Sequence, residues 1–300
     1  MEGTETYFED LVEKYNHFMI DCDGVLLSGT KAIEGSVEAV NRLIEQKKSC
    51  YFITNSSGRT SKGLREKLDK FGISLPETGE ATYCCFSSSY TTSLYIKQEY
   101  PEIKKVFVLG EKGLCDQLEE EGIQTVGLDI TEISIEPEEY ENYELDEDIQ
   151  AVVVGYDQNI NYRKLSIASL YLQNGRKFIA CNPDMFDSIH GRPIPTTGVT
   201  IEALTYITGL KPYICGKPNP HIVNIIDKEF GLPEEEKAKT VMIGDRLTTD
   251  IYLAHNAGVD SCLVLTGCNT AEDVHNKEEN PDKIIPTHVM PRLGHFRESA

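Results

Sequence analysis

The chain of 300 residues is predicted to fold as an α/β protein, a parallel-sheet core that holds an inserted second α/β domain. Short apolar runs alternate with amphipathic stretches, which is typical of a parallel sheet with helices on its faces. This rhythm starts again near residue 106, and the first pattern resumes near residue 240. A middle section bounded in this way indicates an insertion. The expected parts are therefore 1–97 (core), 98–208 (insertion) and 209–300 (core).

The first part of the chain is expected to contain two strand–helix pairs. Strands are predicted at His17–Asp21 and Ser49–Thr54, where short runs of mostly apolar residues occur. A helix is predicted over Val37–Gln46, because its apolar residues recur at helical spacing. A second helix is predicted over Ser61–Lys70, and Gly72 follows it as a residue suited to end a helix.

The later elements follow from the same patterns. The further expected strands and helices are Val106–Leu109, Gln150–Val154, Lys177–Ala180, Thr240–Ile243 and Ser261–Leu265 (strands) and Tyr162–Leu172 and Thr248–Asn256 (helices). The segment Asp129–Asp148 holds ten carboxylates and no lysine or arginine, so it is expected to be a solvated loop or irregular hairpin. No element is predicted after Gly267, where the chain is polar and interrupted by prolines.

Charge and cysteine content exclude several classes of function. A net charge of −20 disfavours non-specific binding to nucleic acid or to an anionic membrane, because both require a basic face. The nine cysteines form no CxxC pair, which argues against a zinc site and a secreted disulfide framework. The first residues lack an apolar targeting segment, and no apolar run is long enough to span a membrane. A cytoplasmic protein is expected.

The segment Asp21-Cys22-Asp23-Gly24 directly follows the apolar run Phe18–Ile20. Residues i and i+2 of a continuing strand share a face. The backbone is expected to curl at this strand end, because Gly24 tolerates torsions that other residues resist. A strand end that presents two acids in one pocket suits a divalent cation and an acid/base pair. A calcium loop of the EF-hand type is excluded, because Leu26 and Ala32 stand where that loop needs Gly and Glu.

Three further polar segments follow in order. Thr54-Asn55-Ser56 ends the second strand with groups that suit phosphate oxygens, or forms an ordinary polar turn. Lys217 lies in a loop without the glycine spacing of a Walker motif, and a lone lysine is commonly solvated surface. Asp245 ends a third strand, and Asp250 follows five residues later, where one of the two acids is alternatively a helix N-cap. Because loops at the carboxyl ends of parallel strands converge, all four segments are expected to form one site.

This ordered set of motifs strongly resembles the haloacid dehalogenase superfamily of aspartate-nucleophile phosphatases. Within it, the chain is similar to the 4-nitrophenylphosphatase group, whose large C2-type cap is inserted between the second and third motifs. That group includes phosphoglycolate and pyridoxal phosphate phosphatases and the bacterial NagD-type enzymes, and the phosphoglycolate phosphatase branch resembles this chain most. The similarity extends from about Asn16 to Gly267. It implies a Rossmann-like core with a parallel sheet.

The resemblance also implies a role for each matching residue. Asp21 would be the nucleophile that forms an aspartyl phosphate, and Asp23 would be the general acid and base. The metal ion would be Mg²⁺, bound by Asp21, by the backbone carbonyl of Asp23 and by Asp245, with Asp250 supporting these groups without touching the ion. The residues implied in phosphate binding are Thr54, Asn55, Ser56 and Lys217. Relatives often carry Asn in place of Ser56, which leaves a side-chain contact from Ser56 open.

The cap is expected to select the substrate through the loop Asn182–Arg192, with Phe186, Asp187 and His190 as candidate specificity residues. The alternative is that this loop only faces solvent. The expected partner is a small phosphorylated metabolite, such as phosphoglycolate; pyridoxal phosphate and a phosphoprotein remain open. A phosphotransferase and a catalytically silent binding protein are the other readings. The resemblance further implies a homodimer formed through the cap.

Overall fold

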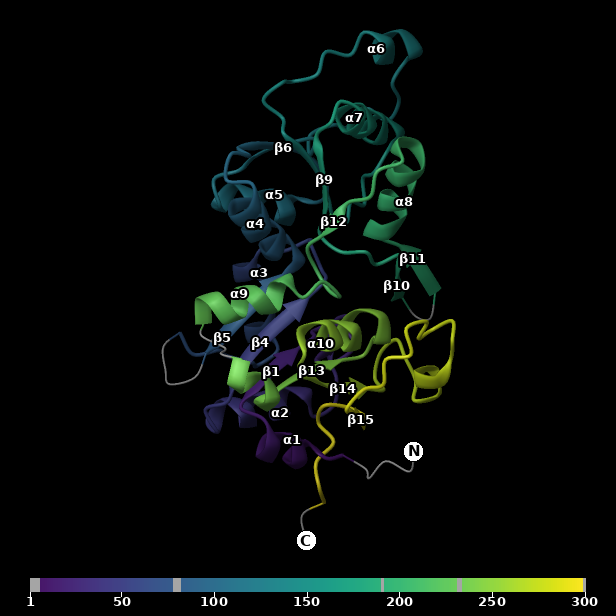
Figure 1. The fold of residues 1–300 in the computed structure, drawn as a ribbon. Coiled ribbons are helices and arrows are strands. Elements are labelled where there is room, and N and C mark those ends of the chain that lie inside the picture. Colours follow the sequence, from purple (N-terminus) through teal and green to yellow (C-terminus); the bar gives the residue numbers. More distant parts are fainter. Residues whose placement is uncertain (1–5, 78–81, 190–191, 231–233, 299–300) are drawn as a thin grey trace. The chain divides into compact units, whose positions relative to one another are not determined.

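The computed structural model describes residues 6–77, 82–189, 192–230 and 234–298. The chain divides into two compact units, each built from separate stretches of sequence (Figure 1). The first unit comprises Met1–Thr54, Leu64–Phe86 and Lys217–Ala300, and the second comprises Asn55–Gly63 and Ser87–Gly216. Among the described residues, no helix is both long and apolar enough to cross a membrane.

The first unit is built on a six-stranded sheet in the order β15-β14-β13-β1-β4-β5. Its strands are β1 (His17–Ile20), β4 (Ser49–Thr54), β5 (Tyr83–Ser87), β13 (Thr240–Gly244), β14 (Asp260–Val264) and β15 (His288–Met290). Strand β1 pairs in parallel with β4 on one side and with β13 on the other. The chain therefore builds outward in opposite directions from β1 and β13, and the crevice at such a switch point is where open α/β sheets bind ligands.

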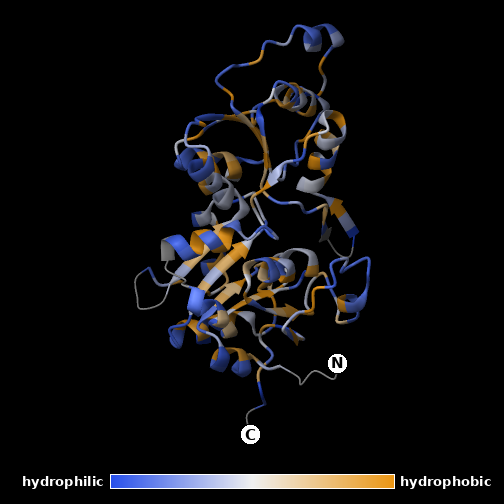
Figure 2. Cartoon of the chain, in the orientation of Figure 1, coloured by the Kyte–Doolittle hydropathy of each residue, from blue (hydrophilic) through white to orange (hydrophobic). Residues whose placement is uncertain are grey.

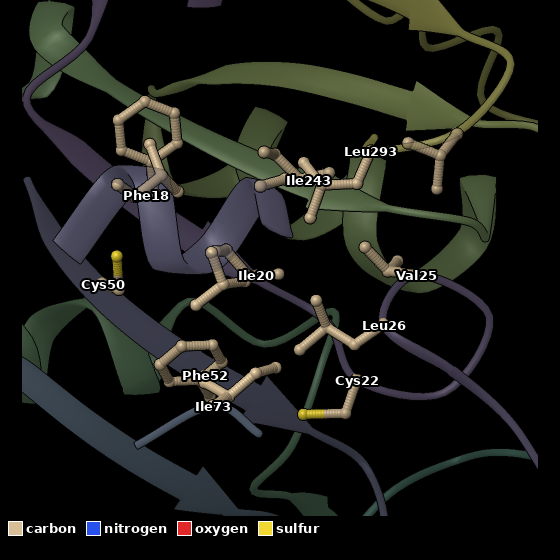
Figure 3. Close-up of a cluster of buried hydrophobic side chains, with 14 of the residues drawn as sticks. Phe18, Ile20, Cys22, Val25, Leu26, Cys50, Phe52, Ile73, Ile243 and Leu293 are labelled. Carbon is tan, nitrogen blue, oxygen red and sulfur yellow. The ribbon is translucent and has the colours of Figure 1, made fainter. Parts of the chain in front are cut away.

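Helices α1 (Phe8–Lys14), α2 (Ser36–Glu45) and α3 (Ser61–Lys70) contribute to the hydrophobic core of the first unit. Figure 3 shows side chains from three strands, Phe18, Ile20, Phe52 and Ile243, gathered near Leu293 from the last part of the chain. Alternate residues of a strand point to opposite faces, so Met19 is also buried but points away from this cluster. The unit also contains helices α9 (His221–Phe230) and α10 (Tyr252–Ala257), of which α10 packs on β13 and β14, and a short antiparallel ribbon of β2 (Leu27–Ser28) and β3 (Lys31–Ala32).

The second unit has its own sheet of five strands, in the order β12-β9-β8-β6-β7. Neighbouring strands in it pair in parallel, and the strands are β6 (Lys105–Leu109), β7 (Gln124–Val126), β8 (Ala151–Val154), β9 (Lys177–Ala180) and β12 (Tyr213–Ile214). Helices α4 (Ser88–Glu99) and α5 (Lys112–Glu120) cover one face, and α7 (Tyr162–Gln173) and α8 (Thr197–Thr208) cover the other. Strand residues alternate between the two apolar layers, as the pleat requires.

The predicted α/β fold with parallel sheets is confirmed, and most predicted elements agree with the structure to within one or two residues. The acidic segment Asp129–Asp148 contains a short helix, α6 (Pro137–Glu141), where only a loop or hairpin was expected. Figure 2 shows the chain around α6 as largely hydrophilic. Ile135 within it is nevertheless buried in the core of the second unit, and the partly buried Ile130, Tyr140, Tyr143 and Leu145 pack against the same cluster.

The end regions contain elements that the sequence patterns did not predict. Helix α1 buries Phe8 and Leu11 in the first core, and the ring of Phe8 meets that of Phe296 edge to face. The tail after Gly267 supplies β15, which extends the sheet beside β14. Both elements are short, so neither contains enough residues for a clear periodic signal.

The main stretch of the second unit, Ser87–Gly216, begins before and ends after the insertion that was expected at 98–208. Helix α4 belongs to the second unit because its Tyr95 and Ile96 pack in one cluster with Val106 and Val108 of β6. Strand β12 belongs there because Ile214 pairs with Ala180 of β9. The second unit also includes two short strands after β9, β10 (Phe186–Ile189) and β11 (Arg192–Pro195), which pair as an antiparallel ribbon.

Candidate active site

Three carboxylates meet at the carboxyl edge of the first sheet. Asp21 directly follows β1 and Asp245 directly follows β13, and these strands pair with Ile20 opposite Ile243. Asp250 joins them from the helical turn after β13. One oxygen atom from each of the three lies within 4.8 Å of the others, and all three residues are buried. The convergence expected from the sequence is therefore confirmed for these acids.

Lys217 is the cation that this cluster contains. Its Nζ atom lies 2.5 Å from Asp21 Oδ1 and 2.7 Å from Asp250 Oδ1, and it donates to the carbonyl of Ile53 at 3.1 Å. Two of these contacts are hydrogen bonds, to Asp21 and to Ile53, and the contact with Asp250 is an ion pair. Lys217 is only 2% exposed. The lysine therefore links the ends of β1 and β4 to the turn that carries Asp250.

Burial and like charge perturb the acids in the same direction. The pKa of Asp21 is raised well above its usual value by burial, and Lys217 opposes this shift while Asp250 and Asp245 add to it. The pKa of Asp245 is also raised, first by burial and then by Asp250, although the N–H of Cys268 opposes the shift. Burial lowers the pKa of Lys217, but Asp21 and Asp250 outweigh it, so the net pKa is raised. The lysine thus stays charged.

The cluster fits a divalent cation. Three carboxylates against one ammonium leave an excess of two negative charges in a buried site when all are ionised. Burying unpaired charge is costly, and a divalent ion would balance it. Mg²⁺ prefers oxygen ligands in an octahedral arrangement. The protein usually supplies one or two carboxylates, and water and substrate phosphate fill the other positions. The residues present therefore suit Mg²⁺, with Asp21 and Asp245 as the carboxylates that the sequence assigned to it.

Asp250 is more fully engaged by the protein than a simple ligand would be. Its Oδ2 accepts the N–H of Arg246 at 3.1 Å, and its Oδ1 faces Lys217. The turn that holds it, Leu247–Ile251, is a π-helix, not the start of the α-helix predicted at Thr248. Such turns often occur at functional sites. These contacts agree with a supporting role for Asp250.

A loop near the end of the chain closes the site around Asp245, and the sequence reasoning did not identify it. The N–H of Cys268 donates to Asp245 Oδ2 at 2.7 Å, and Thr266 Oγ1 donates to the carbonyl of Gly24 at 2.6 Å. Gly24 has φ +91°, and a Cβ atom there or at Gly267 would collide with the Asp245 carboxylate. The sequence did offer a signal for this loop. Gly267 follows strand β14 after a few residues, as Gly24 follows strand β1 in the segment that carries Asp21.

Asp23 does not lie in the buried cluster. Its side chain is 54% exposed, and its Oδ1 lies 3.2 Å from Nζ of Lys67 on α3. The metal contact predicted for Asp23 is its backbone carbonyl, and that contact does not require the Asp23 side chain to join the cluster. An exposed carboxylate beside the nucleophile is accessible to a leaving group, which is the position that a general acid requires.

The predicted phosphate-binding residues are divided between the two units. Thr54 ends β4 in the first unit and is buried. Asn55 and Ser56 belong to the second unit, where the carbonyl of Asn55 accepts from Ser88 at 2.6 Å and from Asn182 at 2.7 Å. Of these predicted residues, Lys217 contacts the acidic cluster of the first unit.

Two of the candidate specificity residues, Phe186 and Asp187, lie on β10. Phe186 is 50% exposed and Asp187 is exposed, both at the start of β10. Gly198 at the start of α8 packs close under this segment, since its N–H donates to the carbonyl of Asp184 at 2.8 Å. The prediction for His190 lies outside the described residues. The predicted loop therefore contains strand β10 and the first residue of β11.

The comparisons with known proteins agree with this site. A protein-family model described as haloacid dehalogenase-like hydrolase matches residues 18–124, and a second family model, described as HAD-hydrolase-like, matches residues 214–289. Human glycerol-3-phosphate phosphatase is 35% identical over 293 residues, 95% of this chain and 90% of that protein. Chloroplastic phosphoglycolate phosphatase 1A of Arabidopsis thaliana is 31% identical, over 96% of this chain and 78% of that protein. The structure of 4-nitrophenylphosphatase from Thermotoga maritima matches with a TM-score of 0.77 and 31% identity, over 95% of this chain and 97% of that one.

The chain therefore belongs to the haloacid dehalogenase-like hydrolases, as the motifs indicated. More narrowly, it is a phosphoric monoester hydrolase, because the relatives that match nearly its whole length are phosphatases.

Proposed function

We propose that this protein is a Mg²⁺-dependent phosphatase that hydrolyses small phosphomonoesters through an aspartyl phosphate. The observation that carries the proposal is the buried Asp21 carboxylate, held 2.5 Å from Lys217 beside Asp245 and Asp250. A carboxylate fixed at a strand end by a charged partner is pre-organised as a nucleophile, because little reorientation remains before attack.

The chemistry follows in two steps. An Asp21 oxygen attacks phosphorus, the ester P–O bond breaks, and Asp23 gives its proton to the leaving alkoxide. Water then attacks the phosphorus of the aspartyl phosphate while Asp23 takes a proton from it. The P–O bond to Asp21 breaks, which releases phosphate and restores the carboxylate. Asp23 is suited to both proton transfers because its side chain is more than half exposed.

Charge compensation is the main requirement of this site, since a phosphate dianion must enter a protein of net charge −20. Mg²⁺ held by Asp21, Asp245 and the carbonyl of Asp23 would neutralise charge on the transferring phosphoryl group. Lys217 holds the Asp21 carboxylate in place, and Asp250 in turn holds Lys217. Thr54, Asn55 and Ser56 would bind phosphoryl oxygens through N–H and hydroxyl groups.

The substrate is proposed to be a small metabolite. The names of the relatives include glycerol-3-phosphate and phosphoglycolate as substrates, and the sequence reasoning had named only the second. The ten carboxylates of Asp129–Asp148 disfavour an acidic phosphopeptide if that segment borders the entrance. Pyridoxal phosphate is the alternative small substrate. Transfer of phosphate to an acceptor alcohol, in place of water, would appear as a phosphorylated alcohol among the products.

Selectivity is proposed to come from Phe186, Asp187 and His190, and assembly from pairing of two cap units into a homodimer. The exposed ring of Phe186 is available to stack on a substrate or to contact a partner. A cytoplasmic location is proposed because all nine cysteines, which lie in described parts of the chain, are free thiols.

The proposal is tested by trapping the intermediate. With Mg²⁺ and a phosphomonoester labelled in its phosphate, wild-type protein should yield an acid-stable, hydroxylamine-labile phosphoprotein, and Asp21→Asn should yield neither this nor turnover. Asp23→Asn should slow hydrolysis of alkyl phosphates by about 10²- to 10⁴-fold, and of 4-nitrophenyl phosphate by less, since that leaving group departs without a proton. Asp282→Asn, which alters an exposed carboxylate, is the control. Turnover by Asp21→Asn at the wild-type rate would refute the mechanism.

A further inference from the structure

Asp23 has a cationic partner that the proposed chemistry does not use. Nζ of Lys67 lies 3.2 Å from Asp23 Oδ1, and both residues belong to the first unit. Lys67 comes from α3, whose Leu64 and Leu68 are buried in the core. The helix is thereby fixed, and its lysine side chain, 21% exposed, points to the rim of the site where Asp23 lies.

Lys67 and Lys217 serve opposite sides of the reacting bond. Lys217 is buried and already committed to Asp21, Asp250 and the carbonyl of Ile53. It therefore lies on the nucleophile side. Asp23 must approach the leaving oxygen to protonate it, so a cation beside Asp23 lies on the leaving-group side.

We propose that Lys67 is a specificity-determining residue that favours phosphomonoesters whose leaving group carries an anion close to the ester oxygen. A 2-phosphoglycolate-like ester, with a carboxylate one carbon away, is the chemical class that fits. The inference rests on the proposed function, because it takes Asp23 as the acid.

The distances support this assignment. A general acid approaches the oxygen that it protonates to about 2.6–3.2 Å, and Nζ of Lys67 lies 3.2 Å from Asp23. When one carboxyl oxygen makes both contacts, the two distances place the ammonium about 6 Å from the ester oxygen, a span that a carboxymethyl group covers. In a protein of net charge −20, an anionic leaving group needs such a local cation.

The test compares three substrates in the full-length protein with Mg²⁺. 2-Phosphoglycolate has an anionic and poor leaving group, glycerol-3-phosphate a neutral and poor one, and 4-nitrophenyl phosphate a neutral and good one. The variants are Lys67→Gln, Lys67→Arg and the matched control Lys70→Gln, which removes the exposed lysine at the end of the same helix.

Lys67→Gln should lower kcat/KM for 2-phosphoglycolate by about 5- to 10-fold more than for glycerol-3-phosphate, as expected for a partly screened ion pair. The loss should appear mainly in KM, shrink at high salt, and be largely restored in Lys67→Arg. Lys70→Gln should behave as wild type.

Two outcomes would overturn the inference. If both alkyl phosphates lost activity equally and 4-nitrophenyl phosphate lost less, Lys67 would only position Asp23. If all three fell together with a lower Tm, its role would be structural. Failure of the proposed function is separate: wild-type protein would then release no phosphate from any of the three.

Discussion

Replacement of Lys217 by methionine would test how the buried acids are held together. Methionine approximates the length of the lysine side chain but has neither charge nor donors. The change removes three contacts of Nζ at once: 2.5 Å to Asp21, 2.7 Å to Asp250 and 3.1 Å to the carbonyl of Ile53. It leaves three buried carboxylates within 4.8 Å of one another without the ammonium that faces two of them.

Removing one partner of a buried ion pair costs about 3–5 kcal/mol, so the metal-free variant should lose about that much unfolding free energy. Asp250→Asn removes one of the excess charges, so Lys217→Met should cost less in that background. The coupling between the two changes should be about 1–3 kcal/mol, the upper range for side chains in contact. Lys237→Met, which removes a lysine paired with the exposed Glu234, should cost no more than about 1 kcal/mol.

The measurement is urea unfolding in EDTA, followed by far-UV circular dichroism because the chain has no tryptophan. If the two units unfold separately, the transition that responds to Mg²⁺ is the one to compare. A loss for Lys217→Met no larger than that for Lys237→Met, together with additive effects in the Asp250→Asn background, would refute the reasoning. The buried acids would then be neutral without the lysine.

Further predictions concern the metal, the cap and pH. EDTA should abolish phosphate release and Mg²⁺ restore it, while Ca²⁺ should bind and inhibit because its larger, looser shell spoils alignment; full activity after chelation would exclude a metal role. Replacing Phe186, Asp187 and His190 together should change kcat/KM by different factors for phosphoglycolate and pyridoxal phosphate, whereas equal factors would make the loop structural. Burial lowers the pKa of His288, so its stabilising contribution is present above the unfolded pKa of about 6.5 and lost as pH falls. His288→Gln should therefore lose less unfolding free energy than wild type between pH 7 and 5, and identical losses in urea titrations would contradict this.

The sequence determined the sheet and the acids at its edge. The apolar runs before Asp21 and Asp245 are local signals, because a buried parallel strand needs consecutive apolar residues. Parallel strands end at one edge, so residues that directly follow them must converge. The positions of Asp21 and Asp245 followed from this rule. The pattern of apolar residues did not predict α1 or β15, because these elements are too short to show a period.

Only the tertiary structure decided which partner each charged group takes. Lys217 reaches Asp21 across 196 positions of sequence, and the pairing of Asp23 with Lys67 depends on how α3 packs through Leu64 and Leu68. Contacts of this kind leave no local pattern, because they arise when separately formed elements pack together. The sequence pattern predicts the acids, because they directly follow apolar strands. The cation that pairs with each acid depends on how distant helices and loops pack.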